Sequence, residues 1–270
     1  MTTTSSLADF TGTLVLAGAG KMGGAMLTGW LAQGLDPARV VVLDPFVSDE
    51  VKALGVAINP ESIANVSVLV VAVKPQMFRE AGATLKSFVQ PSTLVLSIMA
   101  GATLKAITEV CGGRVIRAMP NTPAAIGRGI TVAVPSADIS AEQRAIADAL
   151  LRATGGVEWI DDETLMDAVT AVSGSGPAYV FLLAEELARA GVAAGLPEAL
   201  ATTLARATVS GSGELLRQSD LDSATLRKNV TSPGGTTAAA LAVLMADDGL
   251  QPLMTRAVAA ATARSIDLAK

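Results

Sequence analysis

Short runs of β-branched and other apolar residues recur along the first part of the chain and stop after about Asp161. Several of these runs are almost entirely apolar, which is typical of strands buried on both faces of a sheet. Helix-length segments separate them, so the pattern predicts crossover connections and an α/β fold with a mostly parallel sheet. The predicted strands are Thr13–Ala17, Val40–Leu43, Val68–Ala72, Thr93–Ser97, Val115–Ala118, Ile130–Val134 and Gly156–Trp159.

The remaining residues are rich in Ala and Leu at helical spacing and predict an all-α second domain. We therefore divide the chain into an α/β domain over residues 1–162 and a helical domain over residues 163–270. The many small residues of the helical domain allow its helices to approach closely. Such packing is found in an ordinary bundle and in a bundle that forms a dimer. The predicted helices are Pro177–Ala194, Pro197–Leu216, Thr236–Met245 and Gln251–Ala269.

The chain has 270 residues, no histidine and one cysteine, Cys111. These counts exclude a Ser-His-Asp triad and any zinc site built on histidine or on several thiolates, so no metal centre is expected. One cysteine suits a reducing compartment, and we expect a cytoplasmic protein. The formal net charge of −5 argues against a nucleic-acid partner. The apolar runs are too short to cross a membrane, and the sequence MTTTSSLADF lacks the regions of a signal peptide.

The first predicted strand runs directly into a glycine-rich turn, Gly18-Ala19-Gly20-Lys21-Met22-Gly23, which matches the pattern G-x-G-x-x-G. In such a turn Gly18 permits the tight bend, Gly20 lets a pyrophosphate approach the backbone, and Gly23 lets helix and sheet pack closely. The start of the following helix offers free N–H groups to the anion. Because a strand precedes the motif and a helix-like run follows it, we predict a Rossmann-type dinucleotide-binding domain rather than a turn with only a packing role.

The second predicted strand ends at Asp44, roughly 20 residues beyond the glycine turn, where an acid that binds the ribose is expected. A carboxylate there accepts hydrogen bonds from a 2′-hydroxyl and repels a 2′-phosphate. This position favours NADH over NADPH. The alternative is that Asp44 only caps a turn before Pro45.

A second glycine motif, Thr231–Thr237, precedes a predicted helix in the second half of the chain. Its backbone N–H groups and hydroxyls form a natural anion nest that would suit a substrate carboxylate. Simple capping of the helix is an equally weighted alternative. A third cluster, Ser173–Tyr179, opens a long helix. It is either a flexible start or a place where a nicotinamide or a second subunit approaches the backbone closely.

Over nearly its whole length the chain resembles pyrroline-5-carboxylate reductases, enzymes of the last step of proline synthesis. The resemblance implies a Rossmann domain, a helical domain that dimerises, and an active site where one subunit's Rossmann domain meets helices of both subunits. Dimers of this family can assemble further into decamers. The matching segments are Gly18–Gly23, Val71–Pro75, Arg117–Pro123, Ser173–Tyr179, Gly195–Pro197 and Asn229–Thr237.

The resemblance also implies roles for individual residues. It implies that Thr237 approaches the imine nitrogen and that Asn59 contacts the adenosine ribose. The substrate carboxylate would be held by Ser232, Gly234, Gly235 and Thr236. The cofactor, NADPH in many members, would contact Gly18, Gly20, Lys21, Met22, Gly23, Asp44, Val73, Lys74, Pro75, Met119, Pro120 and Asn121. Many members carry Ser, Asn or Arg where this chain has Asp44, so a preference for NADH is expected here.

The absence of histidine is compatible with an imine substrate, which needs less acid assistance than a ketone. Two other interpretations remain open at this point. Reductases of the β-hydroxyacid dehydrogenase type share the turn and the helical second domain, but they normally need a lysine in the helix after the second glycine cluster, where this chain has only Arg189. A non-catalytic dinucleotide sensor would have the same Rossmann half but would need no carboxylate nest.

Overall fold

The computed structural model describes residues 7–268, and these fall into two compact units. The sheet unit contains the described residues up to Gly174 and those from Thr262 onward, whereas the helical unit contains Ser175–Ala261. This division differs from the boundary predicted at residues 162/163. Residues 163–174 pack with the sheet because Met166 is buried against Val132 and Val134.

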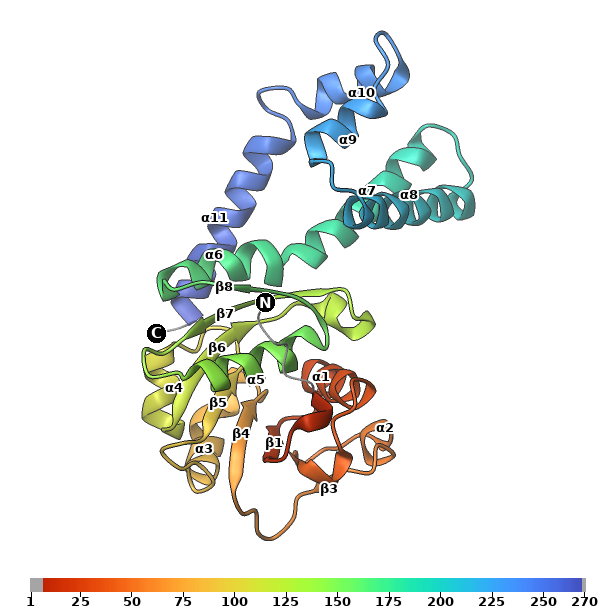
Figure 1. Ribbon diagram of the computed structural model, residues 1–270. Helices are drawn as coiled ribbons and strands as arrows, with labels where there is room; N and C mark the ends of the chain where they lie inside the picture. Colours follow the sequence, from red (N-terminus) through yellow and green to blue (C-terminus); the bar gives the residue numbers. More distant parts are fainter. Residues whose placement is uncertain (1–6, 269–270) are drawn as a thin grey trace. The chain divides into compact units, whose positions relative to one another are not determined.

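The sheet unit contains an eight-stranded sheet in the order β3-β2-β1-β4-β5-β6-β7-β8 (Figure 1). All neighbouring strands are parallel except β6 and β7, which confirms the mostly parallel sheet. Each predicted strand is present, to within two residues at either end. The sequence pattern missed only the two-residue strand β3. The strands are β1 Thr13–Ala17, β2 Val40–Leu43, β3 Ala57–Ile58, β4 Val66–Val71, β5 Leu94–Ser97, β6 Arg114–Met119, β7 Gly129–Pro135 and β8 Gly155–Trp159.

Alternate residues of the strands enter two separate apolar clusters, so both faces of the sheet are covered. On one face Leu14 and Leu16 pack with helices α1 and α5, and the indole nitrogen of the buried Trp30 donates to the carbonyl of Leu150 at 2.8 Å. On the other face Val15 and its neighbours pack with α3 and α4. The helices of this unit are α1 Lys21–Ala32, α2 Asp49–Lys52, α3 Pro75–Lys86, α4 Leu104–Cys111, α5 Ala141–Arg152 and α6 Met166–Val169. Four 3-10 turns (η1 Leu7–Asp9, η2 Pro37–Arg39, η3 Thr122–Ile126 and η4 Glu163–Leu165) and one π-helical turn, Thr170–Gly174, complete it.

The helical unit contains no strand among its described residues, as the sequence predicts. Helices α7 and α8 approach closely where Gly191 faces Ala201, since a Cβ on Gly191 would lie 3.2 Å from the Cβ of Ala201. Gly195 follows the end of α7 with a positive φ of 99°, and the helix ends within one residue of the predicted Ala194. The helices are α7 Gly176–Ala193, α8 Glu198–Gln218, α9 Ser223–Asn229, α10 Thr236–Leu244 and α11 Leu250–Leu268, the last of which ends in the sheet unit. The short helix α9 was not predicted, and Ala269 lies outside the described residues.

The helical unit buries very little of its own apolar surface. Within Ser175–Ala261 only Ala201 and Ala205 are buried, whereas Phe181 is 66% exposed and Leu183 55% exposed. Many exposed large apolar side chains within one unit are typical of a surface that binds a partner. Across the described part of the chain, none of the helices has the length and apolar character needed to cross a bilayer.

Candidate functional site

The glycine turn lies at the carboxyl ends of β1 and β4, where the chain leaves one half of the sheet and begins the other. In this strand order that is the switch point at which open α/β sheets bind ligands. Gly18 has a positive φ of 95°, and a Cβ there would lie 2.6 Å from the carbonyl oxygen of Ala72, the residue that follows β4. A Cβ on Gly23 would overlap the carbonyl oxygen of Gly18. Both positions therefore require glycine for packing, as the motif predicts.

Gly20 differs from these two glycines because a Cβ on it would have no neighbour within 4 Å. The protein itself therefore leaves room for a side chain at Gly20, and a glycine is required there only if a ligand approaches the backbone. Gly20 also precedes the first residue of α1, and no side chain caps that helix. The first N–H groups of α1, from Lys21 to Gly23, consequently remain available to an anion. The residues of the turn thus fit a dinucleotide pyrophosphate.

The carboxyl ends of the neighbouring strands bring further predicted residues to the same edge of the sheet. Helix α3 begins at Pro75, shortly after β4. Lys74, an exposed cation, precedes the helix, and no side chain caps the start of α3. Met119 ends β6, and the buried Pro120 follows it. Pairing of β4 with β5 and of β5 with β6 places these strand ends side by side. The predicted cofactor residues of the sheet unit therefore occupy one edge.

The carboxylate of Asp44 is fixed by backbone groups. One oxygen accepts a hydrogen bond from the N–H of Ala19 at 2.8 Å, and the other accepts one from the N–H of Phe46 at 2.7 Å. The acid at the end of β2 is thus bound to the glycine turn itself and keeps a defined position beside that turn. Asp44 therefore caps a turn, as the alternative interpretation holds, and its carboxylate also lies beside the predicted pyrophosphate site, where an acid that binds the ribose is expected.

Asn59 holds the main chain of Asp44. Its side-chain oxygen accepts from the N–H of Asp44 at 3.0 Å, and its side-chain nitrogen donates to the carbonyl of Asp44 at 2.8 Å. Asn59 itself has a positive φ of 45°, which asparagine tolerates better than most residues. Its amide therefore orients the backbone of Asp44, the acid predicted to bind the ribose. The direct contact of Asn59 with the ribose that the resemblance implies stays a prediction.

Asn121 is buried, and its amide joins two segments of the sheet unit. Its oxygen accepts from the N–H of Ile130 at 2.9 Å, and its nitrogen donates to the carbonyl of Ser173 at 3.1 Å. Ser173 belongs to the π-helical turn, a feature that occurs frequently at functional sites. A Cβ on Gly174 would lie 2.5 Å from the terminal methyl of Met119, so this glycine cluster packs against the end of β6.

In the helical unit, the second glycine motif forms an uncapped helix start. Gly234 has a positive φ of 72°, and Gly235, which has no side chain to offer, stands directly before the first residue of α10. No side chain caps this helix, so simple N-capping by Ser232 or a threonine is not what the structure shows. The N–H groups of Thr236 and Thr237 occupy its first turn and are available to an anion.

Comparison with known proteins agrees with this geometry. A family model described as pyrroline-5-carboxylate reductase dimerisation matches residues 163–268, and one described as NADP oxidoreductase, coenzyme F420-dependent, matches residues 13–101. The pyrroline-5-carboxylate reductase of Pseudomonas aeruginosa is 38% identical over 95% of this chain and 97% of its own length. The Synechocystis enzyme of the same name is 42% identical over 95% of this chain and 98% of its own.

The chain belongs to the pyrroline-5-carboxylate reductase family. Solved structures of the family have the same fold. The reductase of Coxiella burnetii superposes with a TM-score of 0.89 at 32% identity, covering 97% of this chain and all (100%) of the other. The Plasmodium falciparum pyrroline carboxylate reductase, solved with NADP bound, superposes with a TM-score of 0.80 at 29% identity, covering 96% and 99%. Membership in this family confirms the resemblance recognised in the sequence.

The structure of this family member also shows a buried ion pair that the sequence pattern did not reveal. Arg117 of β6 is only 4% exposed and donates to the carboxylate of Glu163 at 2.9 Å. The same carboxylate oxygen accepts from the N–H of Leu104 at the start of α4 at 2.7 Å. Glu163 therefore ties residues 163–174 to the sheet. The arginine in the motif Arg117–Pro123 is the only sequence signal that pointed to it.

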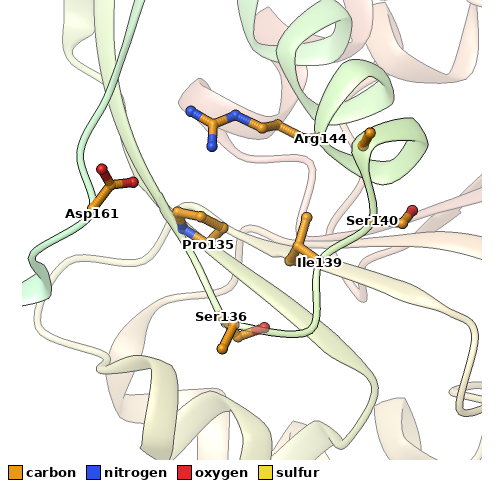
Figure 2. Close-up of a pocket in the computed structure, with 8 residues that line it drawn as sticks. Pro135, Ser136, Ile139, Ser140, Arg144 and Asp161 are labelled. Carbon is orange, nitrogen blue, oxygen red and sulfur yellow. The ribbon is translucent and has the colours of Figure 1, made fainter.

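One hollow of the reductase lies away from the cofactor edge. It has a volume of about 360 Å³ and lies between the end of β7 and the start of α5 (Figure 2). Ser136 follows β7 and donates to the carbonyl of Val115 at the beginning of β6, so the hollow is at the amino edge of the parallel strands. In Figure 2 Arg144 and Asp161 extend into it from opposite sides. None of the predicted site residues lines this hollow.

Cys111 of the reductase is the last residue of α4 and is fully buried. Burial raises the pKa of the Cys111 thiol to about 11, because the apolar surroundings disfavour the thiolate. A thiol with this pKa is a poor nucleophile at neutral pH. Cys111 therefore packs as an ordinary residue of the apolar core.

Proposed function

We propose that this protein reduces 1-pyrroline-5-carboxylate to L-proline with a reduced nicotinamide dinucleotide, the last step of proline synthesis. The observation that carries the proposal is the uncapped start of α10 at Thr231–Thr237, in a chain that belongs to this reductase family and also has a complete dinucleotide turn. A dinucleotide sensor has no need of a second anion site. A β-hydroxyacid dehydrogenase would normally carry a lysine in α7, where this chain has none.

In this proposal the start of α10 binds the substrate carboxylate. The N–H groups of Gly234 and Thr236 and the hydroxyl of Ser232 supply the hydrogen bonds, and the positive end of the helix favours the anion. Gly235 shapes this turn, since its own N–H donates to the carbonyl of Ser232 at 3.1 Å. The hydroxyl of Thr237, one residue further, donates to or accepts from the ring nitrogen and passes a proton from water. These residues hold the ring in one orientation, which accounts for much of the rate of a reaction between two bound molecules.

The bound nicotinamide supplies the hydride, and the substrate supplies a C=N carbon that is already electrophilic when the nitrogen carries a proton. Reduction then removes a positive charge instead of creating an oxyanion, so the protein needs no strong acid at this point. A hydroxyl such as that of Thr237 is sufficient to orient the nitrogen. This chemistry is compatible with a chain that contains no histidine.

The cofactor is held at the carboxyl edge of the sheet by the glycine turn, Lys74 and the Met119–Asn121 segment in this proposal. The fixed carboxylate of Asp44 favours NADH, because a 2′-phosphate would stand close to a charge that two backbone N–H groups hold in place. We expect the family's common use of NADPH to be reversed in this member.

The working form is a homo-oligomer in this proposal, with a dimer as the basic unit and a decamer as a larger assembly. The support is the exposed apolar surface of the helical unit, together with the match of residues 163–268 to a dimerisation domain. A reducing, cytoplasmic location agrees with the single buried cysteine. Sedimentation equilibrium of the purified chain tests the assembly, and a monomer at micromolar concentration would contradict it.

Steady-state reduction of 1-pyrroline-5-carboxylate with NADH and with NADPH in parallel tests the function. We expect turnover with both cofactors and a higher kcat/KM with NADH. A protein that binds either cofactor but turns over neither 1-pyrroline-5-carboxylate nor, at alkaline pH, proline would contradict the reductase assignment and favour a sensor. Turnover with a strong preference for NADPH would contradict only the interpretation of Asp44.

A further inference from the structure

Phe46 has the most exposed large apolar side chain among the described residues, with 89% of its surface accessible. It lies in the loop that follows β2, two residues after the acid assigned to the cofactor ribose. A single exposed apolar residue needs no special explanation by itself. The position and the rigidity of this loop are what distinguish Phe46.

Three residues fix the loop that carries Phe46. Its own N–H donates to the Asp44 carboxylate at 2.7 Å, and the other oxygen of that carboxylate accepts from the glycine turn at 2.8 Å. Asn59 pairs with both main-chain groups of Asp44. The aromatic ring therefore projects from a backbone that is held in place before any ligand binds. Pre-organisation of this kind lowers the entropic cost of binding.

The order of groups in a dinucleotide indicates what reaches this ring. The pyrophosphate lies on the start of α1, and the adenosine ribose lies on the carboxylate of Asp44. The adenine is bonded to that ribose and would therefore lie close to the residues around Asp44. The N–H of Phe46 donates to the carboxylate of Asp44, the group that binds the ribose in this site. The phenyl ring of Phe46 and the adenine are therefore each attached to a group that contacts Asp44. Aromatic rings bind bases by stacking, without hydrogen-bond recognition.

We propose that Phe46 is the stacking platform for the adenine of the cofactor. The proposal rests on the dinucleotide site of the proposed function but not on the reaction or the substrate. Phe46 then contributes to affinity for the adenosine half of the cofactor, whereas Asp44 decides between a 2′-hydroxyl and a 2′-phosphate. The residue does not touch the nicotinamide half.

Equilibrium binding to the purified full-length protein tests this role without turnover. The ligands are NADH, ADP-ribose, which lacks the nicotinamide, and reduced nicotinamide mononucleotide, which lacks the adenosine. We expect Phe46→Ala to weaken NADH and ADP-ribose by between about fivefold and about 100-fold, the range for loss of one stacked base. Reduced nicotinamide mononucleotide should bind the variant and the original protein equally.

Phe46→Tyr and Phe46→Leu separate stacking from simple apolar contact. Tyrosine keeps the ring and should keep NADH affinity within about threefold, whereas leucine should lose most of what alanine loses. Because the side chain is exposed, none of these variants should change the thermal midpoint. Unchanged NADH affinity in Phe46→Ala, or an equal loss for the mononucleotide, would overturn the proposal. NADH binding that depends on Phe46, in a protein that does not reduce 1-pyrroline-5-carboxylate, would instead overturn the proposed function alone.

Discussion

Replacing Asp44 by asparagine should change the choice between NADH and NADPH. The substitution removes one negative charge but keeps the shape of the side chain and one acceptor oxygen. In the native protein the two carboxylate oxygens accept from Ala19 at 2.8 Å and from Phe46 at 2.7 Å. Asparagine can keep one of these hydrogen bonds. The loop should therefore stay near its native conformation while the charge that faces the ribose disappears.

The size of the effect follows from the charges. A phosphate monoester carries about −1.5 to −2 at neutral pH. Two like unit charges 4 Å apart repel by about 1 kcal/mol in water and by about 4 kcal/mol near a protein surface. Because Asp44 is only half-buried, we take the solvated limit, and the doubled charge then gives about 2 kcal/mol, or about 30-fold in kcat/KM for NADPH. Loss of a charge-assisted hydrogen bond to the ribose should cost about fivefold with NADH.

The assay is steady-state kinetics with each cofactor at constant ionic strength. The matched control is Asp49→Asn, because Asp49 begins α2, has a side chain 96% exposed and pairs only with Lys52. That variant changes the net charge of the protein by the same amount without altering the loop at the end of β2. An Asp44→Asn enzyme whose ratio of NADPH to NADH activity stays within twofold of the native ratio would refute the argument, as would an equal shift in the control.

Four other predictions follow from the same geometry. Thr237→Ala should lower kcat for imine reduction by at least about tenfold while NADH affinity, measured by fluorescence titration, changes little; Thr237→Ser should retain most activity. Gly23→Ala should abolish cofactor binding or folding, since its Cβ would overlap the carbonyl of Gly18, and circular dichroism with NADH titration distinguishes the two outcomes. Glu163→Ala should lower the free energy of unfolding, measured in urea, by about 3–5 kcal/mol, because it leaves the buried guanidinium of Arg117 without its carboxylate. A change below about 1 kcal/mol would contradict this role of the ion pair. The thiol of Cys111 should resist a reagent for exposed thiols at pH 8 in the folded protein. The free energy of unfolding should fall as pH rises from about 9 towards 11. The reason is that the pKa of Cys111 in the folded protein, about 11, exceeds its value in the unfolded chain, so the unfolded chain loses the proton first.

Much of the fold could be predicted from local patterns. Strands β1 and β2 begin and end at the predicted residues, because a run such as Val40–Leu43 is wholly apolar and has turn residues close by. The two glycine motifs were located for the same reason, since a strand or a helix adjoins each of them. The family model for the dimerisation domain begins at residue 163, where the second domain is predicted to begin, whereas the compact units divide after Gly174. Residues 163–174 are helical, as expected for the second domain, but Met166 and Glu163 attach them to the sheet.

The sequence by itself determined the alternation of strands and helices, the position of the two glycine motifs and the family, because each depends on residues close together in the chain. Only the tertiary structure decided how distant residues act on one another. Pairing of β1 with β2 brings Ala19 to the carboxylate of Asp44, and the antiparallel β7 moves the hollow beside Arg144 to the opposite edge of the sheet from the cofactor. No local pattern encodes these contacts, since they depend on the order and direction of strands within the sheet.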